Sequence, residues 1–176
     1  MQPWELLLRT FPAVCYTRAG QKPLAARMTL AEKKEQLLQQ LSGLRDAQER
    51  FAFLVERGRS QPSFDAPDKC DRFKVEGCLA NLWLVPSWRD GRCYYRADAD
   101  SVIVKAIAGL LCDFYSGHPP EEIFGMNPAF LGQVGITQHL TPNRRNALSR
   151  VWEQIRSFAQ AHQSASPPMT GIPPQL

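Results

Sequence analysis

The stretch FKVEGCLANLWLVPSWRDGRCYYR, residues 73–96, decides the fold of this chain. Residues 73–75 and the apolar run 79–85 both have the composition of β-strands, and the proline that follows is expected to close the second run. Asp90-Gly91 is a typical two-residue hairpin turn, which leads into a further strand over residues 92–96. The stretch therefore predicts a small antiparallel sheet of about three strands.

Helical patterns precede this sheet. Thr29 and Glu32 form a capping box, in which each side chain bonds the backbone of the other residue, so a helix is expected to begin there. Asp46 and Glu49 form a second box, and Gly58 is expected to end the helix that follows. The apolar residues that these two helices are expected to bury are Leu37, Leu38, Leu41, Leu44, Phe51, Leu54 and Val55.

Two longer helices are expected after the sheet. Asp98 or Asp100 should cap the first of them, which ends before Gly117 and is apolar enough to be the central core helix. Thr141 and Pro142 suit the start of the second, as its cap and its first helical residue. The expected buried residues are Val102, Ile103, Ile107, Leu110, Leu111 and Phe114 in the first and Leu148, Val151, Ile155 and Phe158 in the second.

The order of these elements indicates the fold class. Because the strands lie together in the middle of the chain with helices on both sides, we expect an α+β sandwich and not a parallel array of alternating strands and helices. The small antiparallel sheet should pack against the N-terminal and C-terminal helices.

The composition limits the class of protein. A chain of 176 residues with ordinary apolar content fits one domain with a hydrophobic core. Its formal charge is +4, but residues 1–27 hold four basic residues and one acidic residue, so the remainder carries only +1 and lacks the basic face that nucleic acids require. No apolar run approaches the roughly 20 residues that span a bilayer. We therefore expect neither a nucleic-acid partner nor a membrane partner.

The two ends differ in composition from the middle. Residues 1–27 form a leader with three open interpretations: an organelle-type transit segment, an overextended start with Met28 as the true initiator, or an ordered extra element. The second is favoured, because the leader lacks the serine content and the amphipathic pattern of a transit segment. Residues 28–162 are expected to form the folded domain. Residues 163–176 are uncharged and rich in Pro and Ser, which predicts a disordered tail.

The five cysteines, an odd number at wide spacing, make a poor disulfide framework, so we expect a reducing, cytoplasmic environment. Cys93 in a strand and Cys112 in the core helix are expected to be buried spectators. Cys70 lies in a polar stretch and could act as a resolving thiol.

Cys78 is the main candidate for chemistry. Gly77 before it allows an unusual backbone angle, and amide groups exposed at such a bend stabilise a thiolate, which is the nucleophilic form of cysteine. We expect Cys78 to be partly buried in the free protein, sheltered by Leu79, Leu82 and Trp83, and to turn outward on docking. The alternative is that Cys78 is simply a small buried residue at the start of a strand.

A resemblance to a known family favours the chemical interpretation. Val75-x-Gly77-Cys78 resembles the active-site motif of the SufE family of sulfur acceptors, which includes CsdE, and Trp83 also matches. Leu79-Ala80 departs from the family, which usually has Gln-Ser there. The resemblance covers roughly residues 29–160. Its further matches are Asp98, Asp100, Ile103, Val104, Lys105, Tyr115, Gln138 to Pro142 and Arg144.

The resemblance implies a covalent sulfur carrier. Cys78 would take persulfide sulfur from a pyridoxal-phosphate cysteine desulfurase of the SufS or CsdA type, stimulate that desulfurase, and pass the sulfur to iron–sulfur cluster assembly. Gly77, Asp100 and Arg144 would support the site or face the partner, although Asp100 also suits a helix cap and Arg144 a solvated first turn. The carrier itself would need no cofactor and would have no turnover of its own.

Two other classes of function fit the sequence less well. An iron–sulfur or metal scaffold of related fold would need converging ligands, but no Cys-x-x-Cys pair exists, and His118 and His139 have no close cysteine in the sequence. A cysteine hydrolase would need a histidine base beside Cys78, and no pattern ties either histidine to it. We therefore expect no metal site.

Overall fold

The computed structural model describes residues 28–163, apart from the side chain of His139. The predicted leader over residues 1–27 and the part of the predicted tail beyond residue 163 lie outside this range. The elements are α1 (Leu30–Ser42), α2 (Ala47–Ser60), η3 (Ala66–Asp68), η4 (Asp71–Phe73), β1 (Leu82–Arg89), β2 (Arg92–Ala99), α3 (Val102–Tyr115), α4 (Pro120–Phe124), η5 (Pro128–Gly132), η6 (Thr137–His139) and α5 (Pro142–His162).

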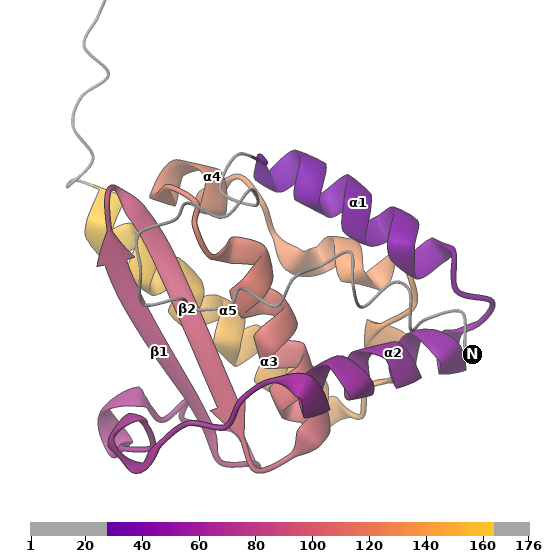
Figure 1. Cartoon of the computed structure of the whole chain (residues 1–176), viewed down its shortest axis with the longest axis horizontal. Helices are drawn as coiled ribbons and strands as arrows, with labels where there is room; N and C mark the ends of the chain where they lie inside the picture. Colours follow the sequence, from indigo (N-terminus) through magenta and orange to yellow (C-terminus); the bar gives the residue numbers. More distant parts are fainter. Residues whose placement is uncertain (1–27, 164–176) are drawn as a thin grey trace, which may run out of the picture.

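The fold is α+β, as predicted, and α3 forms its centre (Figure 1). Eleven of the 14 residues of α3 are buried. The hairpin of β1 and β2 lies on one side of this helix and α2 packs on it from another, while α5 packs against α3, α4 and both strands (Figure 1). The prediction that this apolar segment is the central core helix is confirmed. Within residues 28–163, none of the helices combines the length and the apolar character that crossing a bilayer requires.

The sheet has two strands, so the predicted count of about three is wrong. Residues 73–75 do not form a strand: they contribute only the bridge between Lys74 and Trp83, and the backbone N–H of Val75 donates to the carbonyl of Leu82 at 2.8 Å. The turn at Asp90 and Gly91 is confirmed, with φ of 51° and 72°. Both residues need the left-handed conformation, which suits the twist of a tight hairpin.

Pro86 does not close the first strand, which runs on to Arg89 opposite Arg92. The carbonyl of Leu82 points away from β2, since it accepts from Val75. Backbone groups alternate sides along a strand, so the position of Pro86, four residues on, also faces away from β2. A proline there removes no hydrogen bond from the hairpin, and the strand continues.

Local sequence signals predicted the cap residues of α1 and α2 correctly, but not that of α3. The capping box of Thr29 and Glu32 is present in full. Asp46 caps α2 as predicted, but the carboxylate of Glu49 reaches the N–H of Arg45 at 2.7 Å and not that of Asp46. The cap of α3 is Ser101, so the prediction that Asp98 or Asp100 caps this helix is wrong.

Some of the residues predicted to be buried in the helices are only half-buried or exposed, and other residues are buried in their place. Gly58 does not end α2, which continues to Ser60, because this glycine sits at the crossing with α3. Val102 is 41% exposed. The residues that α2 buries are Phe53, Leu54, Arg57 and Gly58, and those that α5 buries are Ala147, Val151, Ile155 and Ala159, while Phe51, Val55, Leu148 and Phe158 are only half-buried.

Candidate functional site

Cys78 lies in a short loop between Val75 and β1, which we call the Cys78 loop (residues 75–81). Both ends of the loop are tied down. Val75 is buried and bonds Leu82 through its backbone N–H, while the carbonyl of Asn81 accepts from the N–H of Asp100 at 3.1 Å. The side-chain amide of Asn81 donates to the carboxylate of Asp100 at 3.0 Å. The thiol therefore lies on a loop that is anchored at both ends, to the start of β1 and to the residue that follows β2.

Gly77 makes the bend before the cysteine. Its φ is +76°, a conformation that glycine adopts at little cost and residues with a Cβ rarely adopt. A Cβ at this position would also lie 3.3 Å from Nε of Arg150 on α5. The carbonyl of Gly77 accepts a hydrogen bond from the Asn146 side chain, also on α5, at 2.7 Å. The bend is therefore specific for glycine and fastened to the last helix.

Cys78 is half-buried and packs against the edge of the hydrophobic core. The partial burial predicted for it is confirmed. Burial raises the pKa of the Cys78 thiol above its ordinary value, while the positive charge of Arg150 acts in the opposite direction. At neutral pH burial thus favours the thiol form of Cys78 over the nucleophilic thiolate.

Leu79 does not shelter the thiol as predicted, because its side chain is 83% exposed. The other two predicted shelter residues are enclosed: Leu82 is fully buried and Trp83 is half-buried, with Lys69 over its ring at 5.5 Å from the centroid. Leu79 is thus an apolar residue exposed to water directly after the cysteine.

The structure brings Asp100 to the Cys78 loop, and two residues of α5 that were not predicted contact the loop as well. Asp100 is exposed and bonded to Asn81. Arg144 lies in the first turn of α5, and no polar contact of its guanidinium is found among the described residues. Asn146 and Arg150 contact the loop, four residues apart and hence on one face of the helix. Arg144 lies roughly 200° around the helix from Asn146.

Asn146 and Arg150 are the site residues that sequence reasoning missed. Their contacts join positions about 70 apart in the chain, and no local pattern points to such a pair. The one available signal was their spacing of four residues, which places two polar side chains next to each other on a helix.

Asp98 has a structural role in place of the predicted cap. It is 1% exposed and forms ion pairs of 2.9 Å with both Lys69 and Lys105, and it accepts from the N–H of Phe64 at 3.0 Å. Burial alone would raise the pKa of this carboxyl, but the hydrogen bonds from Lys105, Phe64 and Lys69 hold its pKa below the ordinary value. Asp98 therefore joins β2 and α3 to the segment that leads to the Cys78 loop.

The other described cysteines lie apart from any reactive arrangement. Cys93 and Cys112 are buried, as predicted, and burial raises the pKa of both thiols. Cys70 is half-buried at the start of η4. His118 is buried and pairs with Glu122. Among residues 28–163, no group of three or more His, Cys, Asp or Glu side chains is placed to hold a metal ion.

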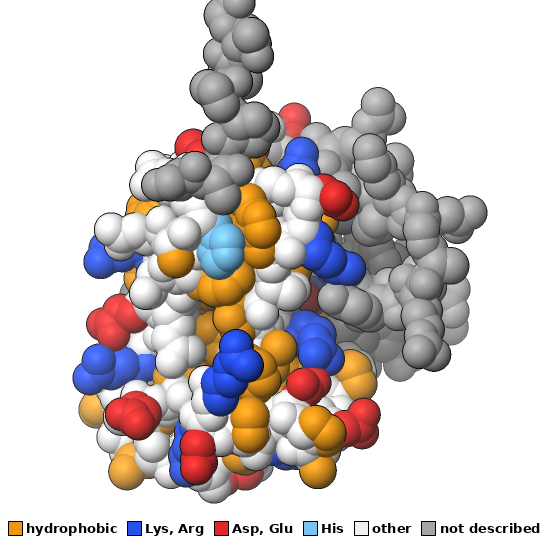
Figure 2. All heavy atoms as spheres, turned by 90° about the vertical axis from the view of Figure 1, so that its left-hand side faces the viewer, with side chains coloured by type: hydrophobic (Ala, Val, Ile, Leu, Met, Phe, Trp, Pro, Cys, Tyr) orange, Lys and Arg blue, Asp and Glu red, His pale blue; other side chains and the backbone are white. Residues whose placement is uncertain are grey.

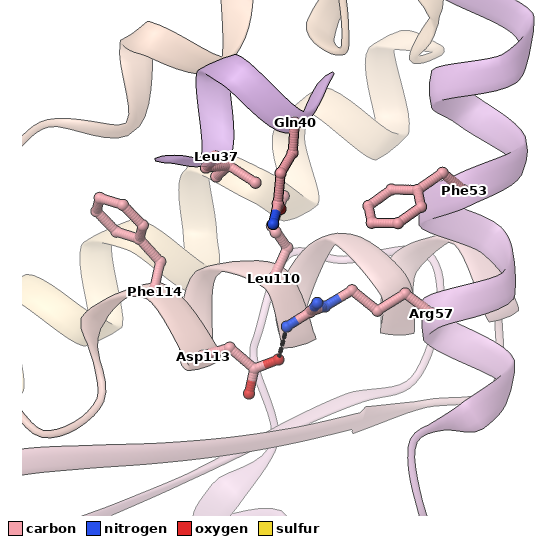
Figure 3. A pocket seen from close by; sticks show the side chains of 7 residues that line it. All are labelled: Leu37, Gln40, Phe53, Arg57, Leu110, Asp113 and Phe114. Atoms are coloured by element: carbon pink, nitrogen blue, oxygen red, sulfur yellow. Dashed lines mark hydrogen bonds and ion pairs between the residues drawn. The ribbon is translucent and has the colours of Figure 1, made fainter. Parts of the chain in front are cut away.

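Two hollows are found away from the loop. A cavity of about 10 Å³ lies between α1, α2 and α3, beside the ion pair of Arg57 and Asp113 (Figure 3), and has room for about one water molecule. A shallower depression of about 380 Å³ lies between α5 and the η5 region. Neither is lined by a residue of the Cys78 loop. Cys78 therefore lies apart from both of these hollows.

The face formed by β1 and the end of α5 is apolar along its middle. Figure 2 shows hydrophobic side chains in a band, with acidic and basic side chains on both flanks. Trp88 of β1 stacks on His162 with ring centroids 4.8 Å apart, and His162 lies 4.3 Å from the ring of Phe158. These contacts close the C-terminal end of α5 onto the sheet.

Comparisons with known proteins identify relatives of the chain. Residues 35–159 match the sequence profile of a family described as SufE: Fe-S metabolism associated domain. SufE-like protein 1, chloroplastic/mitochondrial, of Arabidopsis thaliana is 31% identical over 131 residues, 74% of this chain and 35% of that protein. This chain thus spans about a third of the length of that relative.

Two further matches agree with this. An uncharacterized SufE-like protein of Synechocystis is 26% identical over 138 residues, 78% of this chain and 87% of that protein. The solution structure of a hypothetical protein from Thermus thermophilus has the same fold, with a TM-score of 0.62 at 21% identity, over 76% of this chain and 97% of that one.

Proposed function

This chain belongs to the SufE family, and on that premise we propose that Cys78 accepts persulfide sulfur from a cysteine desulfurase and carries it to a further acceptor. Family membership assigns the chain to iron–sulfur metabolism. The observation that supports the finer proposal is the Cys78 loop: a half-buried thiol on an anchored loop, directly after a glycine at φ +76°.

The transfer needs no external oxidant or reductant. The Cys78 thiolate attacks the terminal sulfur of the persulfide on the desulfurase cysteine, forming a new sulfur–sulfur bond as the old one breaks. The desulfurase cysteine leaves as a thiolate, and Cys78 becomes the persulfide. Attack by a second acceptor on the terminal sulfur of that persulfide then returns Cys78 to its thiolate. The chain is a covalent carrier and desulfurase activator in this scheme, with no cofactor of its own.

The half-buried thiol suits a carrier that must not react before it is docked. Exposed thiolates are oxidised step by step to sulfenic and higher acids, and burial keeps Cys78 in the thiol form. Docking would draw the loop outward, with the exposed Leu79 as an apolar contact for the desulfurase beside the reacting sulfur. The partner is proposed to be of the SufS or CsdA type.

The proposal is tested by mass spectrometry of the intact protein and its peptides after incubation with a SufS-type or CsdA-type desulfurase and cysteine, without reductant. The wild type should gain one sulfur atom on Cys78, and Cys78→Ser should gain none there. Cys70→Ser is the matched control, since Cys70 is also half-buried and precedes the same loop, and it should load as the wild type does.

Sulfur on another cysteine, or none with either desulfurase type, would overturn the proposal and favour the iron–sulfur scaffold alternative. Labelling of Cys78 by an electrophilic substrate analogue, without desulfurase, would instead favour a hydrolase.

A further inference from the structure

The guanidinium of Arg150 presents two different edges at the Cys78 loop. Its Nη1 donates to the Glu153 carboxylate at 3.0 Å. Its Nε and Nη2 face the loop, at 3.3 Å and 3.6 Å from the point where a Cβ of Gly77 would stand. Glu153 thus holds one side of the planar fork and directs the other side at the residue before Cys78.

The edge of the Arg150 guanidinium that faces the loop has two hydrogen-bond donors, Nε and Nη2. Within residues 28–163, no hydrogen-bond acceptor is found for Nε or Nη2 of Arg150. Nε and Nη2 are parallel donors of the kind that bind anions side-on. The hydrogen bond from Asn146 to the Gly77 carbonyl keeps the bend in register with this edge.

We propose that the Nε–Nη2 edge of Arg150 holds the anionic sulfur of this site, first the Cys78 thiolate and then the terminal sulfur of its persulfide, with Asn146 as the positioning residue for the loop. The inference rests on the proposed function of Cys78 as the sulfur acceptor. It adds a cationic residue from the middle of α5 to the site.

Charge and exposure agree with this assignment. Arg150 is the charged group whose field acts on the Cys78 thiol, against the effect of burial. Lys74, directly before the loop, and Glu76, on the loop, are both exposed and of opposite sign. The Asp100 carboxylate bonds Asn81 at the far end of the loop, and Glu153 neutralises part of the charge of Arg150. The Arg150 side chain is 48% exposed, so water weakens its field and the effect on Cys78 should be moderate.

The experiment measures the rate of Cys78 alkylation by iodoacetamide against pH, read from the Cys78 peptide by mass spectrometry in the full chain. Arg150→Gln should lower the rate at neutral pH about threefold and move the titration midpoint up by about half a pH unit. Glu153→Gln should act in the opposite direction, because it leaves the charge of Arg150 uncompensated. Arg156→Gln removes an equal charge from the exposed side of α5 and should match the wild type.

An Arg150→Gln profile that overlays the wild-type profile would overturn the inference. Circular dichroism shows whether each variant is folded, and Arg150→Lys serves if the glutamine variant is not. The lysine keeps the charge but lacks the paired donors, so it should restore the alkylation profile and still load sulfur from the desulfurase more slowly than the wild type. Loading at the wild-type rate would contradict the role of the paired edge.

The two proposals fail in different ways. Alkylation requires no desulfurase, so a shifted profile with no sulfur loading would reject the acceptor function and keep only the effect of Arg150 on the Cys78 thiolate. Loading of Cys78 with unshifted alkylation would do the reverse.

Discussion

Among single residues, Gly77 makes the bend that precedes Cys78. The φ of +76° turns the chain so that the thiol packs inward and Leu79 points into water. The motif residue Val75 is buried and anchors the loop to β1, and Trp83 pairs across to Lys74. Val75 and Gly77 therefore fix the position and the bend of the loop that carries the sulfur.

Gly77→Ala should disturb the loop in two ways. The new Cβ meets the Arg150 guanidinium at 3.3 Å, and the positive φ strains the backbone, at a cost of about 1 kcal/mol in the free energy of unfolding. We expect desulfurase-dependent sulfur loading of Cys78 to fall severalfold, measured by mass spectrometry over time.

Gly91→Ala is the matched control for this change. Gly91 has nearly the same φ, +72°, but nothing lies within 4 Å of its Cβ position in the hairpin turn. This variant should lose similar stability in urea denaturation and load sulfur at the wild-type rate. Equal loading by both variants would show that the Gly77 bend has no part in the transfer.

At the scale of elements, the close crossing of α2 and α3 supports the strand and loop that carry the site. A Cβ on Gly58 would lie 2.6 Å from Cβ of Ala106 and 2.9 Å from the carbonyl of Val102. The two helices can approach this closely only with a glycine at the contact. α3 in turn packs on β2, and Asp98 at the end of β2 pairs with Lys105 of α3.

Gly58→Ala should therefore destabilise the protein, although alanine favours a helix by about 1 kcal/mol over glycine. We expect a net loss of about 1–3 kcal/mol in the free energy of unfolding, because the helices must separate to admit the methyl group. The measurement is the urea midpoint at constant slope.

Gly125→Ala provides the comparison, since its φ is −70° and its Cβ position has ordinary contacts of 3.6 Å. Its stability should stay within about 0.5 kcal/mol of the wild type. If Gly58→Ala also left the free energy of unfolding unchanged, the close contact of α2 and α3 at Gly58 would not contribute to stability, and the prediction would be wrong.

At the scale of the whole molecule, a buried polar cluster joins the N-terminal helix to the centre. Nζ of Lys33 donates to three carbonyls at the end of α3, at 3.1–3.3 Å, and burial lowers the pKa of this amine to about 8. Glu122 of α4 accepts from the N–H of Leu30 and lies 2.9 Å from Nδ1 of His118. α1, α3 and α4 are thus held together by groups whose charge depends on pH.

The stability of the protein should fall as the pH drops below about 6.5. Burial, with the positive charge of Lys33, holds the pKa of His118 below its ordinary value despite the contact with Glu122. The unfolded chain then binds a proton that the native state resists, and this residue alone should cost about 1–2 kcal/mol between pH 7 and pH 5.

Urea denaturation at the two pH values tests this. His118→Gln should show a smaller loss between pH 7 and pH 5 than the wild type, whereas His162→Gln, a change outside this cluster, should lose as much as the wild type does. The prediction would be contradicted if the wild type lost no more stability between pH 7 and pH 5 than His118→Gln does.

The features that could be predicted from the sequence are those that depend on near neighbours in the chain. The capping box at Thr29, the hairpin turn at Asp90-Gly91 and the apolar core helix each arise from residues within a few positions of one another, so local physics suffices. The motif around Cys78 likewise marked the loop and its family. These features establish the α+β class and the thiol as the centre of interest.

The contacts between residues far apart in the chain became known only from the folded structure. Residues 73–75 form a bridge and not a strand, Asp98 is an ion-paired core residue and not a cap, and Asn146 and Arg150 contact the Cys78 loop from α5. Each outcome depends on a contact between segments far apart in the chain. Burial and charge pairing set the free energy of such contacts. Neither can be read from a few neighbouring residues, because both depend on which segments meet when the chain folds.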